Sequence, residues 1–152
     1  MIVEDTVDFH LRSTLFTMRR MYNLIAQKNG ITQGIGYALI NIDKEGIPAT
    51  KIAPLMGMTS SSLSRLLKIM EDDGLVYRKP DKEDKRVVRI FLTIKGNNLR
   101  KKVEEVVLDF NDKLFKKLEL KDLQAFERVN NVIKEQAKLE INEYKNIVSH
   151  HS

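Results

Sequence analysis

One stretch of the chain, residues 57–96, constrains the fold more than any other. It reads GMTSSSLSRLLKIMEDDGLVYRKPDKEDKRVVRIFLTIKG. Thr59 is a favourable helix N-cap, apolar residues then recur at helical spacing, and Gly74 suits the left-handed position that ends a helix. Two segments rich in β-branched and aromatic residues, 75–78 and 87–93, flank a polar tip. This order predicts a recognition helix followed by a β-hairpin wing, two elements whose shapes suit the grooves of duplex DNA.

Apolar residues also recur at three- and four-residue steps on both sides of this stretch. Thr32 is a good N-cap for the helix that follows it, and a turn is expected over residues 43–46. Pro48 should open the next helix, which Pro54 is expected to bend or shorten because proline lacks a backbone donor. The predicted helices cover residues 5–28, 33–42, 48–56, 60–72, a range from 94 or 96 to about 118, and 121–147.

The long terminal helices carry more apolar surface than the module between them can cover. The same helices of a second copy, related by a two-fold axis, would cover it most simply. We therefore predict a homodimer of mainly α subunits, each with a small β-hairpin wing. Residues 31–96 would form a winged helix-turn-helix DNA-binding lobe, and residues 1–30 and 97–152 a helical dimerisation region. The alternative is an intramolecular bundle of the long helices.

The basic excess of the chain is concentrated in one region. The formal net charge is +5, from 26 Lys and Arg against 21 Asp and Glu. Residues 59–102 hold 12 of the basic and 6 of the acidic side chains, so this region accounts for the whole excess. A basic surface of this kind favours a polyanionic partner. The alternative is a solvated charged face of the sort that many proteins carry.

The composition also bears on the compartment. The chain has no cysteine and no apolar run long enough to span a bilayer. Its first residues, MIVEDTVDFHLRS, carry acids where a secretory signal would carry bases. We therefore expect a cytoplasmic protein with no disulfide, no thiolate chemistry and no membrane partner.

Sequence motifs of enzymes and cofactor sites are missing. There is no glycine-rich phosphate loop, no HExxH helix and no G-x-S-x-G turn. We therefore expect neither catalysis nor a cofactor. The only histidines are His10, His150 and His151, and no cysteine assists them, so we predict no metal site. The alternative is a carboxylate-rich site that combines His10 with acids among residues 4–8.

Serines and an arginine occupy the start of the predicted recognition helix. Serine hydroxyls and the first amides of a helix can donate to phosphate oxygens, but serine discriminates poorly between bases. Arg65 is the better base reader, because its guanidinium can bind guanine O6 and N7 together. The alternative is that the serines only cap and solubilise the helix. The DNA contacts predicted here are Ser60, Ser61, Ser62, Ser64, Arg65 and Lys68.

The charged tip of the predicted hairpin supplies a second set of contacts. Arg86 is the candidate for an A·T-rich minor groove, because such a groove concentrates negative potential and Arg leaves water more readily than Lys. The predicted phosphate contacts are Arg78, Lys82, Lys85 and Arg89, and the alternative for each is a solvated cation. An alternative function is a winged helix that binds protein without sequence-specific DNA binding. That function predicts an apolar patch on the exposed face of the recognition helix.

Three short motifs resemble those of the MarR family of bacterial winged helix-turn-helix regulators. The sequence contains Gly74-Leu75-Val76-Tyr77-Arg78, then Asp81-Lys82-Glu83-Asp84-Lys85-Arg86, then Leu92-Thr93 and Gly96. They are similar in order and spacing to the family's G-L-V-x-R, D-x-x-D-x-R and L-T-x-x-G motifs. The order of the helices extends the resemblance over nearly the whole chain. It implies a DNA-binding transcriptional regulator, for which we expect repression.

The resemblance also implies roles for further residues. By the family pattern, Asp84 would hold Arg86, or a recognition-helix cation such as Arg65, in place. Members commonly lose DNA affinity when a small aromatic or phenolic ligand binds between the dimer helices and the DNA lobe. The alternative for the aromatic residues of such a pocket is an ordinary core position. The pocket residues that the resemblance implies are His10, Arg12, Phe16, Tyr37 and Tyr77.

Overall fold

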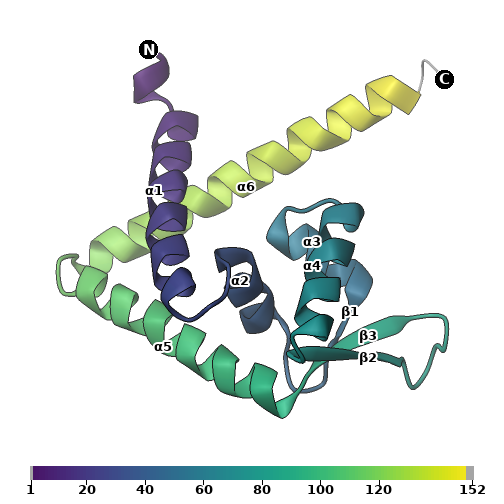
Figure 1. Ribbon diagram of the computed structural model, residues 1–152. Helices are drawn as coiled ribbons and strands as arrows, with labels where there is room; N and C mark the ends of the chain where they lie inside the picture. The colour runs from purple at the N-terminus through teal and green to yellow at the C-terminus, as the bar shows by residue number, and fades with distance from the viewer. Residues whose placement is uncertain (1, 150–152) are drawn as a thin grey trace. The chain divides into compact units, whose positions relative to one another are not determined.

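The computed structural model describes residues 2–149, so His150 and His151 lie outside the described residues. The predicted class, mainly α with a small hairpin, is confirmed (Figure 1). The chain divides into two compact units, Met1–Val106 and Val107–Ser152. The elements in chain order are η1 Val3–Asp5, α1 Val7–Lys28, α2 Gln33–Asn41, β1 Ile47–Pro48, α3 Ala49–Met56, α4 Ser60–Asp72, β2 Val76–Pro80, β3 Val88–Leu92, α5 Ile94–Phe115 and α6 Leu120–Ser149.

The sheet of the first unit has three antiparallel strands in the order β1-β3-β2. The hairpin pairs Val76 with Leu92 at its base and Pro80 with Val88 near its tip. The short strand β1 was not predicted, because it pairs Ile47 with a residue of β3 that is remote in the sequence. Pro48 consequently precedes α3 as its N-cap instead of forming its first turn. Pro48 and Pro80 lie on the edge strands β1 and β2, where the missing backbone donor of a proline costs no hydrogen bond of the sheet.

The core of the first unit lies between α2, α3, α4 and the sheet. Leu39, Ile52, Leu67 and Ile90 are fully buried, and these four side chains come from four different elements. On the inner face of α4, Leu63, Leu67 and Met70 are buried, whereas Leu66 is partly buried and packs against this core. Because neighbouring elements share the core, the start of α4 and the base of the hairpin are held in one rigid frame.

Helix α4 begins and ends at the predicted residues, Ser60 and Asp72. The Thr59 hydroxyl accepts from the backbone amide of Ser62 at 3.2 Å, and Gly74 has a φ of 67°. In α3, Pro54 lies two residues before the helix ends, so the helix still reaches Met56. Pro54 therefore does not shorten the helix, which ends at the predicted residue. The proline removes only one backbone donor in the last turn.

The start of α5 is fitted closely against the turn between α4 and β2. The Thr93 hydroxyl donates to the carbonyl oxygen of Gly74 at 2.7 Å and accepts from the amide of Gly96 at 3.0 Å. A Cβ atom on Gly96 would lie 2.0 Å from the carbonyl oxygen of Leu75. The L-T-x-x-G motif therefore has a steric reason, because only glycine lets the helix approach this backbone.

The long helices carry exposed apolar side chains. In the first unit, α1 has no buried residue, and Leu15, Phe16 and Leu24 are each more than half exposed. In the second unit, none of residues 107–147 is buried, and Phe126 and Tyr144 of α6 are about two thirds exposed. Among the described helices, none combines the length and the apolar content that crossing a bilayer requires.

Candidate nucleic-acid interface

The first turns of α4 present a small, polar and exposed face. Ser60, Ser61, Ser62 and Ser64 are all exposed. The hydroxyls of Ser61 and Ser62 lie 3.2 and 3.0 Å from the Thr59 hydroxyl, and Ser64 donates to the carbonyl oxygen of Ser60 at 2.9 Å. Two of the serine hydroxyls therefore contact the capping Thr59, while the exposure of all four serines leaves room for a phosphate oxygen. Their role in DNA contact stays a prediction.

The two cations of this face differ in their surroundings. Arg65 is exposed, and no described residue forms a hydrogen bond or ion pair with its side chain. Lys68 forms an ion pair with Asp72 at 2.7 Å, one helical turn further on, and this carboxylate raises the pKa of the lysine. Asp72 therefore partly compensates the charge of Lys68, whereas Arg65 keeps its five donors for an external partner.

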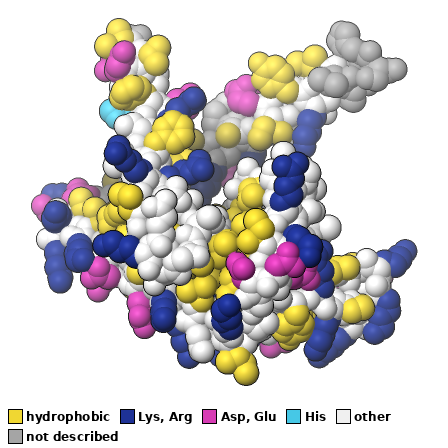
Figure 2. Space-filling view, in the orientation of Figure 1, with side chains coloured by type: hydrophobic (Ala, Val, Ile, Leu, Met, Phe, Trp, Pro, Cys, Tyr) yellow, Lys and Arg dark blue, Asp and Glu magenta, His cyan; other side chains and the backbone are white. Residues whose placement is uncertain are grey.

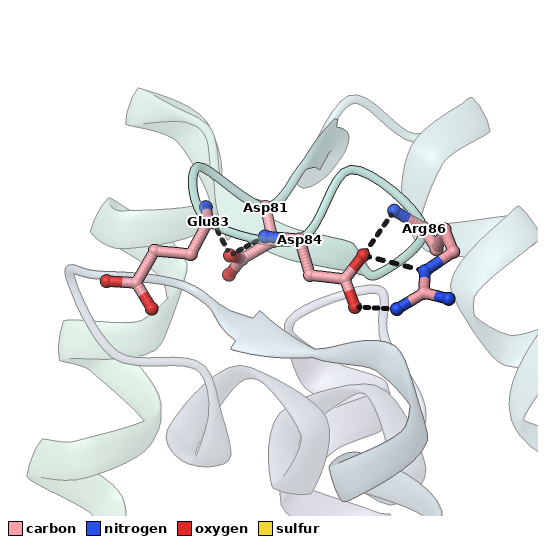
Figure 3. A network of polar contacts seen from close by, with 4 residues as sticks. All are labelled: Asp81, Glu83, Asp84 and Arg86. Atoms are coloured by element: carbon pink, nitrogen blue, oxygen red, sulfur yellow. Dashed lines mark hydrogen bonds and ion pairs between the residues drawn. The ribbon is translucent and has the colours of Figure 1, made fainter.

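The wing tip is organised by two carboxylates (Figure 3). Oδ1 of Asp81 accepts from the backbone amides of Glu83 at 2.9 Å and Asp84 at 3.2 Å. Both carboxylate oxygens of Asp84 accept from the Arg86 guanidinium, at 3.0 and 3.1 Å, and Oδ1 also accepts from the Arg86 amide at 3.0 Å. Of the two partners that the resemblance implied for Asp84, the structure therefore shows Arg86.

These contacts lower the pKa values of both carboxyl groups. The pKa of Asp81 lies below its ordinary value because the amides of Glu83 and Asp84, and then Arg89, stabilise the ionised form. The pKa of Asp84 is lowered first by the Arg86 side chain and then by the Arg86 amide. Arg86 itself remains at the surface, with 90% of its side chain exposed, so the pair orients the guanidinium without covering it.

Two other predicted phosphate contacts have protein partners. Arg89 is only 26% exposed and binds Asp81 at 2.9 Å and the carbonyl oxygen of Gly46 at 2.6 Å. Arg78 donates to Glu71 of α4 at 2.9 Å. Both arginines therefore join the hairpin to the rest of the first unit, and their role as phosphate contacts stays an untested prediction.

Lys82 and Lys85 are exposed cations of the wing loop, and within the described part of the chain neither forms an ion pair or side-chain hydrogen bond. Figure 2 shows Lys and Arg side chains gathered over the β2–β3 hairpin. On the β2 strand, the amino group of Lys79 lies 5.1 Å from the centre of the Tyr77 ring. With Arg65 and Arg86, these two loop lysines are the predicted cations that remain most accessible to a polyanion.

The residues implied for an effector pocket are distributed over three elements. Arg12 and Phe16 line a shallow hollow of about 340 Å³ on α1, together with Asp8, Leu11 and Leu15. The rings of His10 and Phe9 are nearly perpendicular with centres 5.8 Å apart, and Tyr77 stacks on Phe91 with ring centres 5.5 Å apart. Tyr37 and Phe16 are exposed, so they are not core residues of the first unit. The structure therefore brings together only part of the predicted set.

Three residues of the interface were not singled out from the sequence. No role was predicted for Asp81, although the motif that it opens indicates that it lies at the start of the wing loop. Gly46 has no local signal, because its partner Arg89 lies 43 positions away, and Glu71 meets Arg78 only once the turn after α4 brings β2 back against the helix. No group of three or more His, Asp or Glu side chains is placed to hold a metal ion among the described residues.

The sequence is similar to known bacterial regulators. The MarR family model matches residues 41–88. The organic hydroperoxide resistance transcriptional regulator of Bacillus subtilis is 31% identical over 107 residues, which cover 70% of this chain and 73% of the relative. The HTH-type transcriptional regulator PetP of Rhodobacter capsulatus is 37% identical over 60 residues, or 40% of this chain and 36% of PetP. These relatives are regulators, which confirms the expectation that the chain is not an enzyme.

Solved structures show the same fold. The MepR–DNA complex of S. aureus aligns with a TM-score of 0.73 at 23% identity and covers 88% of this chain and 98% of MepR. The structure of MarR aligns with a TM-score of 0.72 at 20% identity and covers 94% of this chain and 98% of MarR. Together with the family model and the B. subtilis relative, they establish that this chain belongs to the MarR family of DNA-binding transcriptional regulators.

Proposed function

We propose that the chain represses transcription by binding duplex DNA sequence-specifically as a homodimer. In each subunit α4 enters the major groove and the β2–β3 hairpin reaches the minor groove. The observation that carries this proposal is the exposed face of α4, where four serines and the unpartnered Arg65 stand beside a wing whose Arg86 is 90% exposed. The structure of MepR, which has the same fold, is a complex with DNA, and this supports DNA as the partner of this chain.

Dimerisation accounts for the apolar side chains of the long helices. Phe9, Leu15 and Phe16 of α1 are exposed, as are Phe126 and Tyr144 of α6. Exposed apolar surface of this extent is typical of a protein interface. A two-fold pairing through the helices at residues 1–30 and 97–152 would cover it and would present two copies of α4 to one duplex. Sedimentation equilibrium should give twice the chain mass, and a monomer would contradict this part of the proposal.

Selection of bound fragments from random duplex DNA tests sequence-specific binding. The expected product is a palindrome whose half-sites are centred about one helical turn, 10 base pairs, apart, because a two-fold dimer reads two half-sites in this way. A single unpaired half-site would contradict dimeric docking. Recovery of no enriched sequence would favour the alternative, a winged helix that binds protein.

A small aromatic acid is the proposed effector. The hollow beside Arg12 and Phe16 offers a cation and apolar walls, with the carboxylate of Asp8 as its one acidic group, and at about 340 Å³ it accepts only a small ligand. Such a ligand releases DNA only if it binds the DNA-competent arrangement less tightly than another arrangement of the protein. Benzoate should therefore weaken DNA binding by the native chain more than by an Arg12→Ala variant. Equal weakening of both proteins, or none, would remove this site from the proposal.

A further inference from the structure

A continuous path of hydrogen bonds joins the turn before β1 to the tip of the wing. It starts at the carbonyl oxygen of Gly46, to which Nη2 of Arg89 donates at 2.6 Å. Nη1 of Arg89 donates to Oδ2 of Asp81 at 2.9 Å, and Oδ1 of Asp81 accepts from the amide of Asp84 at 3.2 Å. The path ends where the Asp84 carboxylate binds the Arg86 guanidinium (Figure 3).

The Gly46 end of this path is fixed in position. Gly46 has a φ of +70°, and a Cβ atom there would lie 2.7 Å from the Phe91 ring and 2.9 Å from the carbonyl oxygen of Ile90. The turn is therefore pressed against β3, and its carbonyl oxygen is a rigid acceptor. The Arg89 side chain that binds it is only 26% exposed, and its partner Asp81 is 17% exposed. An ion pair sheltered to this extent is screened less than one on the surface.

The wing tip is ordered by hydrogen bonds and not by core packing. Besides the path above, the Asp81 amide donates to the carbonyl oxygen of Val87 at 2.8 Å, and the Val87 amide donates to that of Asp84 at 2.9 Å. Of residues 81–87, none is buried, and Lys82, Glu83, Lys85 and Arg86 are exposed. A loop of this kind is mobile unless polar contacts close it, and ordering it on DNA would cost conformational entropy. The bonds from Asp81 to the amides of Glu83 and Asp84 close the loop before DNA arrives.

We propose that Asp81 and Arg89 are positioning residues that hold the wing so that Arg86 meets the minor groove, and that Arg89 is not a phosphate contact. The proposal rests on the proposed function, in which Arg86 contacts DNA. It replaces the prediction made for Arg89 from the sequence. Its physical basis is that the Arg89 guanidinium already donates to the Asp81 carboxylate and to the Gly46 carbonyl oxygen, and it would have to leave both acceptors to reach a phosphate.

The direction in which Asp81→Asn changes the DNA affinity distinguishes a positioning role from a simple effect of charge. Asp81→Asn removes a negative charge near the polyanion, so an account based on charge alone predicts tighter binding. The positioning account predicts weaker binding, by about tenfold, because the change weakens the bond to Arg89 by an amount typical of one charge-assisted hydrogen bond. Glu83→Gln is the matched control, since the Glu83 carboxylate points away from the network in Figure 3. This control should bind more tightly than the native chain.

The experiment measures the affinity of the full-length chain for an A·T-flanked duplex, using Asp81→Asn, Glu83→Gln, Arg86→Ala and the double variant of Asp81 and Arg86. Positioning through Arg86 predicts that the double variant binds no more weakly than Arg86→Ala alone, since coupled residues are not additive. Tighter binding by Asp81→Asn, or full additivity in the double variant, would overturn the proposal. If Arg86→Ala alone has no effect, the minor-groove part of the proposed function fails instead.

A second measurement needs no DNA. Backbone ¹⁵N order parameters of residues 82–86 should fall in Asp81→Asn and in Arg89→Gln, and should stay at their native values in Glu83→Gln. Native values in all three variants would overturn the positioning role whatever the chain binds. Loss of signals across the whole first unit would show that Asp81 and Arg89 stabilise the fold in general, which also contradicts a specific role in the wing.

Discussion

The recognition helix and the wing present their cations in different ways. On α4, Arg65 has no partner among the described residues, and the helix backbone alone fixes where its side chain starts. On the wing, Arg86 is held by Asp84, and Arg89 by Asp81 and Gly46. A helix packed on a core is rigid without help from its exposed side chains, whereas a loop tip must be ordered by its own polar contacts.

This difference explains why acidic residues lie within a surface proposed for a polyanion. Asp81 and Asp84 would repel phosphate if they were isolated, but each is paired with an arginine and accepts backbone amides. The two carboxylates lower the net positive charge of the wing, and in return they fix the positions of its arginine side chains. The two regions therefore contribute different properties, with accessible charge supplied by α4 and by Lys82 and Lys85, and a preset geometry supplied at Arg86.

The largest expected effect comes from the close contact between the start of α5 and the turn that links α4 to β2. Gly96→Ala places a Cβ atom 2.0 Å from the Leu75 carbonyl oxygen. This contact can be relieved only if α5 moves away from the backbone of Leu75. Urea titration should show a loss of about 3 kcal/mol in the free energy of unfolding, as overpacking against backbone typically causes. The control Gly74→Ala meets no atom within 4 Å but has a φ of +67°, so it should lose only about 1 kcal/mol. Equal losses would show that this contact relaxes easily.

Removal of the unpartnered arginine should have the next largest effect. Arg65→Ala should weaken binding to the selected site by about 2 kcal/mol, or some thirtyfold, because a bidentate contact to guanine is lost. Lys68→Ala should cost less, since Asp72 already compensates that lysine. Affinities measured on the selected duplex and on a scrambled one separate base reading from phosphate contact. Equal loss on both duplexes would make Arg65 a phosphate contact.

The wing should show a smaller and more selective effect. Arg86→Ala should weaken binding about tenfold on duplexes with A·T-rich flanks, where the narrow groove attracts a guanidinium, and less on G·C-rich flanks. Competition binding with the two flank types measures the difference. A uniform loss would leave the helix as the source of all sequence preference and would remove the distinction between the two regions.

The smallest effect concerns pH and distinguishes the two regions directly. The pKa values of Asp81 and Asp84 are lowered in the folded wing, so their contribution is complete above the unfolded value, near pH 4. It is lost only as the pH falls through the lower folded values. Amide signals of Glu83, Asp84 and Arg86 should stay constant between about pH 8 and pH 5, and change only below about pH 4. The Ser62 amide is bound by the Thr59 hydroxyl, which does not titrate, and its signal should not follow them.

The fold and the site differ in how far the sequence alone predicts them. The bounds of α4 were predicted correctly because Thr59 and Gly74 are local signals that act within a few residues. Strand β1 was missed because two residues carry no periodicity and their partner strand is remote. Arg89 looked like any solvated cation of the hairpin, since the turn that supplies its second acceptor lies 43 positions away.

The salt dependence of DNA binding tests the central claim most directly, because it counts the cations that displace counterions. Arg65, Lys82 and Lys85 have no ion-pair partner among the described residues, and the paired Arg86 keeps 90% of its side chain exposed, so we count these four cations in each subunit. Two subunits therefore predict a slope of about −7 for the logarithm of the binding constant against the logarithm of salt concentration. A slope near half that value would mean that a single subunit makes the contacts. A slope near zero would contradict the account.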